Sequence, residues 1–231
     1  MKILAFIPAR GGSVGLKNKN LINLAGKPLI QYTFDTIKKL GKTVYPFVST
    51  NDKKIANYSA KKGFGTTYRR PSALSKSSSN VIDAIIHGVK WVNETKRLNF
   101  DIILILQPTT PIRDFKEVKK AISIFKKKKM LSMASVTPMR EHPYECIEIN
   151  NKNWKFLKKT KKNVFRRQQF KKNFLFIDGS FYIIRKHFLQ KFKKLIKENK
   201  TNFFILNRNW PIDIDQKEDL YVANSFIRGA Y

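Results

Sequence analysis

The sequence predicts an α/β fold with a mostly parallel sheet, on the basis of three observations. Short, continuous apolar runs alternate with segments of helical periodicity through the first half of the chain. Continuous apolar runs are typical of strands buried on both faces, and the strand–helix alternation implies right-handed crossovers that cover the sheet on both sides. The most unusual polar motifs directly follow predicted strands, where ligands of such sheets bind.

The first elements are a strand, a turn, a helix and a second strand. The apolar run Ile3–Pro8 predicts a buried strand, and a glycine-rich turn follows it at residues 10–15. Leu29–Leu40 has helical spacing, and Gly41 directly after it is a typical helix terminator. Residues 44–49 predict the second strand.

The same alternation continues to the middle of the chain. Residues 52–62 predict a helix closed by Gly63, and residues 81–92 predict another amphipathic helix. Residues 101–106 form an apolar run that predicts a third strand. Residues 114–127 predict a helix, which Asp114 can cap at its start.

The second half is less regular. A further strand is predicted at residues 131–136. Residues 140–185 combine strand-like pieces with a basic loop, and we expect them to protrude as a β-rich excursion from a single domain spanning residues 1–231. A basic helix, a short strand and a closing helix that begins at Gln216 should follow. The strand-like pieces are 144–149 and 174–184, the basic helix is 187–199 and the short strand is 211–215.

The composition is that of a folded protein with an unusual charge. Apolar residues make up 42% of the 231 residues, which supports a substantial core and excludes a disordered chain. Lys and Arg total 47 against 16 acidic residues, a formal net charge of +31. Such a charge fits nucleic-acid binding, contact with an anionic membrane surface, or a compositional bias toward lysine. The spread of lysines along the whole chain favours the bias.

The sequence also bears on the cellular compartment. Cys146 is the single cysteine, so no disulfide can form within the chain. The apolar stretch of residues 3–7 is too short for a signal peptide, and residues 102–106 are far too short to span a bilayer. We expect a cytoplasmic protein without membrane insertion.

A loop that is rich in glycine and basic residues spans residues 10–20 and is called the glycine-rich loop below. Glycines directly after a buried strand let backbone N–H groups approach phosphate oxygens closely. The spacing matches neither the P-loop motif nor the dinucleotide-binding glycine motif. The loop fits a triphosphate, although a plain turn can have the same composition. Its notable members are Arg10, Gly11, Gly12, Ser13, Lys17, Lys19 and Asn20.

Two aspartates alternate with isoleucines at residues 212–215, called the aspartate segment below. In an extended chain, residues two apart point to the same face, so Asp213 and Asp215 present their carboxylates together. Neighbouring carboxylates repel each other unless a cation lies between them, and Mg²⁺ prefers carboxylate, phosphate and water oxygens. The alternation favours a magnesium site, and the alternative is that the pair caps the following helix.

Two further polar motifs are candidates for ligand binding. Gln107 leaves a predicted strand into a proline-stiffened loop and can hydrogen-bond a sugar. Arg70 lies in a basic turn, Tyr-Arg-Arg-Pro at residues 68–71, and can contact a base edge or a phosphate. Taken alone, each is also compatible with an ordinary surface residue.

In this order, the motifs resemble those of the acylneuraminate cytidylyltransferases, the CMP-sialic acid synthetase family. Each motif is short, but the ordered set is specific and extends over nearly the whole chain. The matching motifs are Ile-Pro-Ala-Arg-Gly-Gly-Ser at 7–13, Lys-Asn at 19–20, Gly-Lys-Pro-Leu at 26–29, Val-Ser-Thr at 48–50, Arg-Pro at 70–71, Leu-Gln-Pro-Thr at 106–109, Arg-Gln at 167–168 and Ile-Asp-Ile-Asp at 212–215.

The resemblance implies a nucleotidyltransferase-type, Rossmann-like three-layer fold and a homodimer, with residues 140–185 serving dimerisation and substrate closure. It implies Mg²⁺ at Asp213 and Asp215, with Mn²⁺ as a substitute. The implied catalytic residues are Arg10, Lys19, Asp213 and Asp215. The other implied CTP-binding residues are Gly11, Gly12, Ser13, Asn20, Arg70 and Ser79. The implied sugar-binding residues are Gln107, Arg167 and Tyr182.

Three positions depart from the usual family pattern. Val14 stands where Lys is common, which removes a phosphate contact, and Val81 stands where Ser is common, with Ser residues at 77–79 just upstream. Asp178 precedes Gly179 where Asn is common, in a region near the sugar. These departures leave the identity of the sugar open and raise the alternative of an inactive relative that only binds nucleotide.

The expected reaction is transfer of CMP from CTP to the anomeric hydroxyl of a nonulosonic acid, an acidic nine-carbon sugar, with release of pyrophosphate. Sialic, legionaminic and pseudaminic acids fit, and the sequence of residues 15–20 favours the first two. An eight-carbon 3-deoxy-2-keto acid is the alternative within the enzyme class. A basic nucleic-acid-binding protein is the alternative from another class, but no nucleic-acid-binding motif supports it.

Overall fold

The computed structural model describes residues 2–13, 15–151, 153–159, 174–207 and 212–229. Its main sheet consists of β1 (Ile3–Pro8), β4 (Tyr45–Ser49), β5 (Ile102–Ile105), β6 (Ser132–Pro138), β9 (Leu175–Arg185) and β10 (Thr201–Ile205). Two small antiparallel pairs accompany it, β2 (Asn23–Leu24) with β3 (Lys27–Pro28) and β7 (Ile147–Asn150) with β8 (Asn153–Phe156). The helices are α1 (Leu29–Leu40), α2 (Lys53–Lys61), α3 (Val81–Lys96), α4 (Phe115–Lys127), α5 (Lys186–Phe192) and α6 (Lys217–Ile227). Short 3-10 turns lie at Lys19–Leu21, Gly41–Thr43 and Ser72–Leu74.

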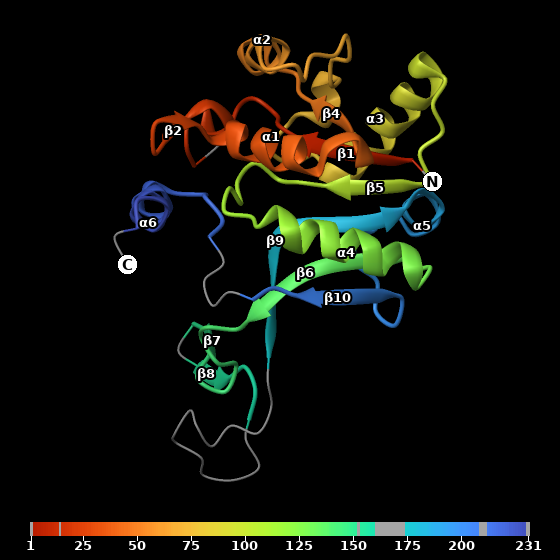
Figure 1. The fold of residues 1–231 in the computed structure, drawn as a ribbon. Coiled ribbons are helices and arrows are strands. Elements are labelled where there is room, and N and C mark those ends of the chain that lie inside the picture. Colours follow the sequence, from red (N-terminus) through yellow and green to blue (C-terminus); the bar gives the residue numbers. More distant parts are fainter. Residues whose placement is uncertain (1, 14, 152, 160–173, 208–211, 230–231) are drawn as a thin grey trace.

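The main sheet has the strand order β10-β6-β9-β5-β1-β4 (Figure 1). β1 pairs in parallel with β4 and β5, and β10 pairs in parallel with β6. β9 runs antiparallel to both of its neighbours, β5 and β6. The prediction of a mostly parallel sheet is therefore confirmed, with β9 as the departure from it.

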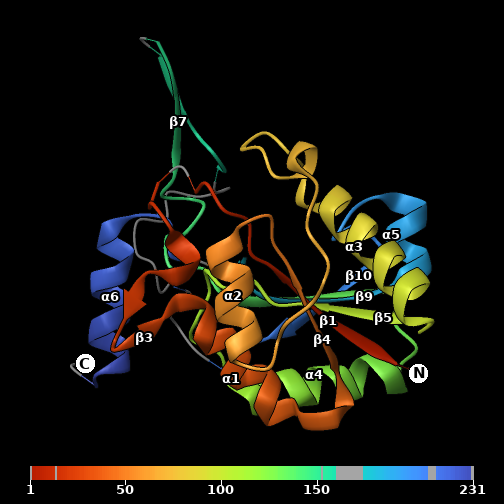
Figure 2. The ribbon, with the colours of Figure 1, turned by 90° about the horizontal axis from the view of Figure 1, so that it is seen from above.

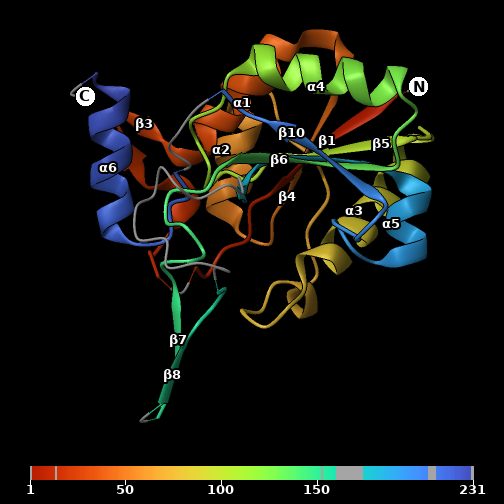
Figure 3. The ribbon, with the colours of Figure 1, turned by 90° about the horizontal axis from the view of Figure 1, so that it is seen from below.

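Helices cover both faces of the sheet, as Figures 2 and 3 show. On one face, α1 and α4 pack on the strands through a core that includes Phe34 and Phe125. On the other face, α3 and α5 pack around Val89 and Phe188. These layers confirm the predicted three-layer architecture, and they leave the ends of the strands free for a site.

A third, smaller core lies beside the three layers and joins the two ends of the chain. It brings α6 against the segment between β1 and α1, and its buried members are Leu16, Leu24, Leu29, Ile212, Ile214 and Ala223. A hydrogen bond of 2.8 Å from the backbone N–H of Ala25 to Asn224 Oδ1 adds to this contact. The third core therefore places the glycine-rich loop next to the aspartate segment.

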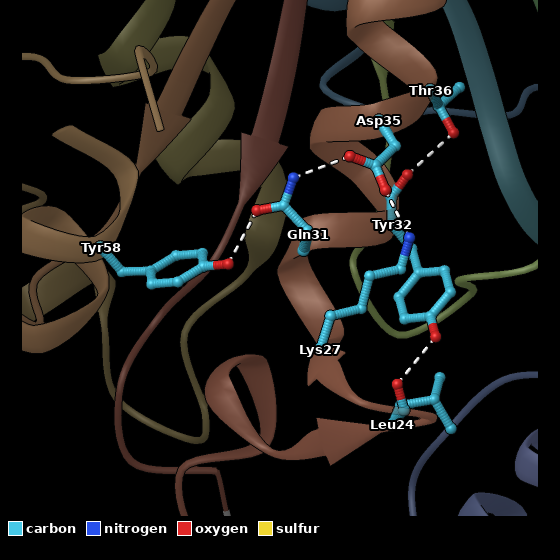
Figure 4. A network of polar contacts seen from close by, with 7 residues as sticks. All are labelled: Leu24, Lys27, Gln31, Tyr32, Asp35, Thr36 and Tyr58. Carbon is cyan, nitrogen blue, oxygen red and sulfur yellow. Dashed lines mark hydrogen bonds and ion pairs between the residues drawn. The ribbon is translucent and has the colours of Figure 1, made fainter. Parts of the chain in front are cut away.

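The start of α1 carries a closed network of polar contacts (Figure 4). Lys27 Nζ lies 2.5 Å from Asp35 Oδ2, Gln31 donates to Asp35 Oδ1 at 2.7 Å, and Tyr58 of α2 donates to Gln31 Oε1 at 2.7 Å. Burial opposes the ionisation of Asp35, but the hydrogen bonds from Lys27 and Gln31 and the charge of Lys27 outweigh it, so the pKa of Asp35 lies below its ordinary value. The network fastens α1 to α2 and to the β2–β3 pair.

The segment predicted to protrude divides in the structure. β7 and β8 form a hairpin that projects away from the body (Figure 3), whereas β9 runs through the main sheet. The dimerisation role of residues 140–185 stays a prediction.

The helix predicted at residues 187–199 is wrong beyond Phe192. Lys193 adopts a left-handed φ of 46°, which ends α5. Ser132 then donates a hydrogen bond of 2.7 Å to the Leu195 carbonyl, an acceptor that a continuing helix would use itself. A tertiary contact that helical periodicity does not report therefore replaces the last turns.

The strand predicted at residues 211–215 is also wrong for the described residues 212–215, which pair with no strand. The backbone N–H of Ile214 instead bonds to the carbonyl of Thr109 in the loop after β5, at 2.8 Å. The predicted alternation holds nonetheless, because Ile212 and Ile214 are buried while Asp213 and Asp215 are exposed.

Candidate active site

The carboxyl ends of the parallel strands β1, β4 and β5 meet at one edge of the main sheet, and a pocket of about 450 Å³ opens beyond that edge. Most of the predicted site residues lie around this pocket. Its lining consists of Pro8, Arg10, Ser13, Gly15, Lys19, Asn20, Arg70, Leu74, Ser79, Val81, Gln107, Pro108, Thr109, Asp215 and Gln216. Chain segments from the first twenty residues and from the last twenty thus share one cavity.

The glycine-rich loop rests on the segment that follows β4. The backbone N–H of Gly11 donates to Asn51 Oδ1 at 2.9 Å, and a Cβ at Gly11 would lie 2.9 Å from Asp52 Oδ2. Asp52 is held in place because it caps α2. Gly12 has a φ of 70°, a conformation that favours glycine. Gly11 and Gly12 line a small recess beside the main pocket rather than the pocket itself.

The loop touches the aspartate segment at Gly15. A Cβ at this position would lie 2.6 Å from the backbone carbonyl oxygen of Asp215, so any larger residue would push the two segments apart. On the other side of the loop, the Asn20 side chain donates to the Arg10 carbonyl at 2.9 Å. The path of the loop is therefore fixed from both sides of the pocket.

Lys19 bridges the same two segments with its side chain. Its Nζ lies 2.6 Å from Asp215 Oδ1. The Lys19 side chain is 11% exposed, whereas that of Asp215 is 70% exposed. Within the described ranges Asp215 is the one hydrogen-bond partner of Nζ, and an ammonium group has three donors. The remaining donors can serve a ligand in the pocket.

Asp213 keeps an exposed side chain beside Asp215, but the surrounding protein removes part of its water. This desolvation raises the pKa of the Asp213 carboxyl, and the charge of Asp215 raises it further. A hydrogen bond from Thr109 and the charges of Lys19 and Arg113 act in the opposite direction. The net result is a pKa of Asp213 above the ordinary value.

The two carboxylates are not used to cap the following helix, so the capping alternative is wrong. Gln216 and Asp219 form the capping box of α6 instead. Two exposed carboxylates on one face fit a hard divalent cation that completes its shell with phosphate and water oxygens. The described residues hold no cluster of three or more His, Cys, Asp and Glu, so such a cation would need those additional oxygens.

Arg70 presents a buried positive charge at the pocket. The residue is 5% exposed, and its guanidinium donates to the Ser49 hydroxyl at 3.0 Å and to the Ser49 carbonyl at 2.7 Å. Burial lowers the pKa of Arg70 to about 10, and the nearby Arg10 charge also lowers it. In the part of the chain that the structure describes, no carboxylate pairs with Arg70. The site can therefore hold an acceptor or an anion from a ligand.

The loop after β5 is fastened by Arg113. Its guanidinium donates to the carbonyl of Ser180 at 2.6 Å and to the hydroxyl of Thr110 at 2.7 Å. It also donates to the carbonyl of Gln107 and to the hydroxyl of Thr33 in α1. Four groups from three parts of the chain thus hold Gln107 at the edge of the pocket.

The start of β9 completes this end of the site. Asp178 is buried and accepts hydrogen bonds of 2.5 Å from the hydroxyls of Ser135 and Ser180. Gly179, with a φ of 72°, lies against Gln107, because a Cβ there would be 3.0 Å from Gln107 Oε1. The Asp-Gly pair that departs from the family pattern therefore shapes the wall next to Gln107.

Tyr182, a predicted sugar-binding residue, is not among the residues that line the pocket. Tyr182 is half-buried on β9 and packs against the α3–α5 core, and burial raises its pKa, with smaller contributions from Asp178 and Asp213. Arg167 lies outside the described residues, as does Val14.

The comparison with known families agrees with this geometry. A family model described as Cytidylyltransferase matches residues 4–229. The chain belongs to the cytidylyltransferase family. It is 35% identical over 151 residues to the CMP-N,N'-diacetyllegionaminic acid synthase of Legionella pneumophila, a match that covers 65% of this chain and 64% of that one. It is 25% identical over 223 residues to the pseudaminic acid cytidylyltransferase of Campylobacter jejuni, covering 96% of this chain and 95% of that one.

The fold of this cytidylyltransferase is also that of a solved structure, a CMP:2-keto-3-deoxy-manno-octonic acid synthetase complexed with CTP. The two superpose with a TM-score of 0.72 at 16% identity and cover 100% of each other. The predicted nucleotidyltransferase-type fold is therefore confirmed, and so is the prediction of a CTP-dependent nucleotidyltransferase.

Sequence patterns alone gave no separate role to three residues of the cytidylyltransferase site. Gly15 appears in the sequence as one glycine of a turn, Thr109 as part of a Gln-Pro-Thr-Thr motif, and Arg113 as the end of that motif. Each one contacts a residue far away in the chain. Gly15 lies against the carbonyl of Asp215, Thr109 hydrogen-bonds Asp213, and Arg113 donates to the carbonyl of Ser180. Only the polar character of the Gln107–Arg113 loop carried a signal.

Proposed function

We propose that this cytidylyltransferase transfers CMP from CTP to the anomeric hydroxyl of a nonulosonic acid and releases pyrophosphate. The observation that carries the proposal is one pocket that brings cationic side chains together with a carboxylate of the aspartate segment. Arg10, Lys19 and Arg70 supply the cations, and Asp215 supplies the carboxylate, with Asp213 two residues before it in the chain. The sequence relatives named for legionaminic and pseudaminic acid support the sugar class.

The cationic side chains suit the nucleotide. Arg10 and Lys19 would hold the triphosphate, with Gly12 and Ser13 offering backbone N–H groups, whereas the N–H of Gly11 already donates to Asn51 Oδ1. The buried guanidinium of Arg70 would bind cytosine. Asn20, which is 6% exposed and already fixed on the Arg10 carbonyl, would contact the ribose, and Ser79 lines the same side of the pocket.

The opposite end suits the acidic sugar. Gln107, held by Arg113 and backed by Gly179, would hydrogen-bond a sugar hydroxyl. Tyr182 and Arg167 are proposed sugar contacts from the resemblance alone. In the structure Tyr182 packs against the α3–α5 core.

The chemistry would be a direct displacement. The anomeric oxygen of the sugar attacks the α-phosphorus, the bond to the bridging oxygen of the β-phosphate breaks, and the hydroxyl proton passes to water. Arg10 and Lys19 stabilise the negative charge that grows on the leaving pyrophosphate. Gln107 and Arg70 align the two substrates. Mg²⁺, or Mn²⁺ in its place, would be held by Asp213 and Asp215 and would supply charge neutralisation at the α-phosphate.

The test is pyrophosphate release with CTP and Mg²⁺ against a panel of acidic sugars. We expect turnover with legionaminic- or sialic-type acids, and the panel should include pseudaminic acid and an eight-carbon 3-deoxy-2-keto acid. Turnover with the eight-carbon acid alone would contradict the sugar class. Salt-dependent binding of DNA or RNA without any pyrophosphate release would contradict the proposal as a whole and favour the nucleic-acid alternative.

We further propose that the protein acts as a homodimer in the cytoplasm. The projecting hairpin and the adjacent start of β9 expose a set of large apolar side chains. Exposed apolar patches of this kind are typical of protein–protein interfaces. The exposed side chains are Ile147, Ile149, Trp154, Phe156, Leu157, Leu175, Phe176 and Ile177. Among the described residues, no helix is long and apolar enough to cross a membrane. Light scattering of the purified protein would test the dimer.

A further inference from the structure

Lys19 and Asp215 form an ion pair in the structure, although each side chain also has a proposed ligand. The triphosphate is the proposed ligand of Lys19, and a divalent cation is that of Asp215. The distance of 2.6 Å means that the ammonium group takes up one of the carboxylate oxygens that a cation would need. The two ligands and the ion pair therefore compete for the same two groups.

We propose that Lys19 is the internal counter-ion of Asp215, and that its ammonium group moves to the triphosphate when a divalent cation takes the carboxylate. This inference rests on the proposed function, because it uses CTP and a divalent cation as the two ligands. The inference adds that the binding of CTP and the binding of the cation are linked through the side chain of Lys19, in addition to any direct contact between the two ligands.

The burial of the two partners supports the exchange. A side chain that is only 11% exposed needs a nearby anion, because an uncompensated charge in that position is costly. Asp215 is 70% exposed and can be reached by a cation from the pocket. Lys19 therefore leaves Asp215 readily only when another anion is at hand, and a triphosphate in the same pocket is such an anion.

The backbone geometry supports a short movement. Gly15 holds the loop against the Asp215 carbonyl, so the backbones of the two segments stay in contact while the side chain changes partner.

The exchange predicts opposite effects of one substitution on two ligands. A divalent cation that binds without the triphosphate must displace the ammonium group of Lys19 from Asp215. This displacement makes the net binding of the cation less favourable. Removal of Lys19 should therefore strengthen the binding of the cation alone, while it weakens the binding of CTP. A lysine that served only the triphosphate would not produce the first effect.

The experiment measures Mn²⁺ binding without nucleotide by electron paramagnetic resonance of the free ion. Lys19→Met should bind Mn²⁺ about fivefold or more tightly than the wild type, a coupling of the usual size between linked sites. Lys17→Met is the matched control, because it removes the same charge from an exposed position of the same loop and should bring no such gain. Lys19→Gln provides a second variant in case the first is poorly folded.

Unchanged or weaker Mn²⁺ binding in both Lys19 variants would overturn the inference, as would an equal gain in Lys17→Met, which would indicate a general field effect. Addition of Asp215→Ala to Lys19→Met should abolish the gain, and a gain that persisted would also contradict it. Pyrophosphate release by the wild type is assayed separately. Its absence would count against the proposed function, whereas the Mn²⁺ titration decides the role of Lys19.

Discussion

In the described part of the chain, two lysine–aspartate pairs have nearly the same length and very different surroundings. Lys27 and Asp35 are 2.5 Å apart, and their side chains are 39% and 35% exposed. Lys19 and Asp215 are 2.6 Å apart, but their side chains are 11% and 70% exposed. The first pair is closed into a network with Gln31 and Tyr58 (Figure 4), and the second faces a pocket.

The difference teaches that access, and not distance, separates a structural ion pair from an exchangeable one. Both oxygens of Asp35 already accept hydrogen bonds from its own helix and from Lys27, so no ligand gains by entering. The carboxylate of Asp215 is open while its lysine is enclosed, so each partner can accept a different ligand. Four substitutions test this contrast, from the largest expected effect to the smallest.

Asp213→Asn removes one negative charge from the carboxylate pair of the aspartate segment. We expect CMP transfer to fall by about a thousandfold or more, because the loss of charge stabilisation worth several kcal/mol has this effect on a rate. The fold should not suffer. The raised pKa of Asp213 means that its contribution to stability is present below the ordinary aspartate pKa of 3.8 and is lost as the pH rises through the folded value.

Thermal unfolding in EDTA at neutral pH measures the stability and should show Asp213→Asn to be at least as stable as the wild type. Pyrophosphate release measures the rate of CMP transfer. Turnover near the wild-type level would show that the metal assignment is wrong.

Gly15→Ala breaks the contact between the loop and the aspartate segment. The added Cβ would lie 2.6 Å from the Asp215 carbonyl and must displace it, and misplacement by about 1 Å can cost a hundredfold in rate. We expect a loss of this order in kcat/KM. Gly65→Ala is the matched control, because its Cβ meets Ala60 at 3.1 Å and neither residue lines the pocket. Equal activity losses in both variants would indicate a general packing defect.

Arg113→Lys loosens the support of Gln107. One ammonium group cannot replace a guanidinium that donates to four acceptors. We expect the KM for the sugar to rise about tenfold, since a hydrogen bond to a charged group contributes about 1.5 kcal/mol or more, while the KM for CTP changes little. Arg228→Lys, at an exposed position, should leave both constants unchanged. An increase in the KM for CTP alone would contradict the positioning role.

Asp35→Asn removes the negative charge of the Lys27–Asp35 pair and should have the smallest effect. We expect a loss of about 0.5 kcal/mol in the free energy of unfolding and no change in turnover, because solvent screens a pair that is more than one third exposed. The lowered pKa of Asp35 makes its contribution present above the ordinary aspartate pKa of 3.8 and lost as the pH falls through the folded value. The difference from the wild type in urea unfolding should therefore vanish in acid. A difference that grew in acid would show that the sign is wrong.

Much of the site could be predicted because the motifs coincide with the chain path. Arg10 and Gln107 each follow a strand of a parallel sheet, and the carboxyl ends of such strands meet at one edge. The alternation of Ile and Asp in the aspartate segment also survives, because burial of the isoleucines in the third core fixes which face points outward.

The rest depends on contacts between residues far apart in sequence. The partner of Lys19 is 196 positions away, and only the third core brings the two together. Beyond α5 the Leu195 carbonyl accepts a hydrogen bond from Ser132, which is 63 positions away, whereas periodicity alone favours a longer helix. Tyr182 pairs with Ile105 across the sheet and packs against the α3–α5 core, a placement that its local sequence does not report, and its role at the sugar stays a prediction. None of these contacts leaves a local pattern.

The separation of 196 positions between Lys19 and Asp215 has a consequence for protein synthesis. A nascent chain on the ribosome folds its N-terminal segments first, so the strand β1 and the loop after it emerge long before the residues of α6. Until the segment before α6 adds Ile212 and Ile214 to the third core, a partly translated chain presents Lys19 without its partner Asp215. The pocket is therefore completed only by the last part of the chain to be synthesised.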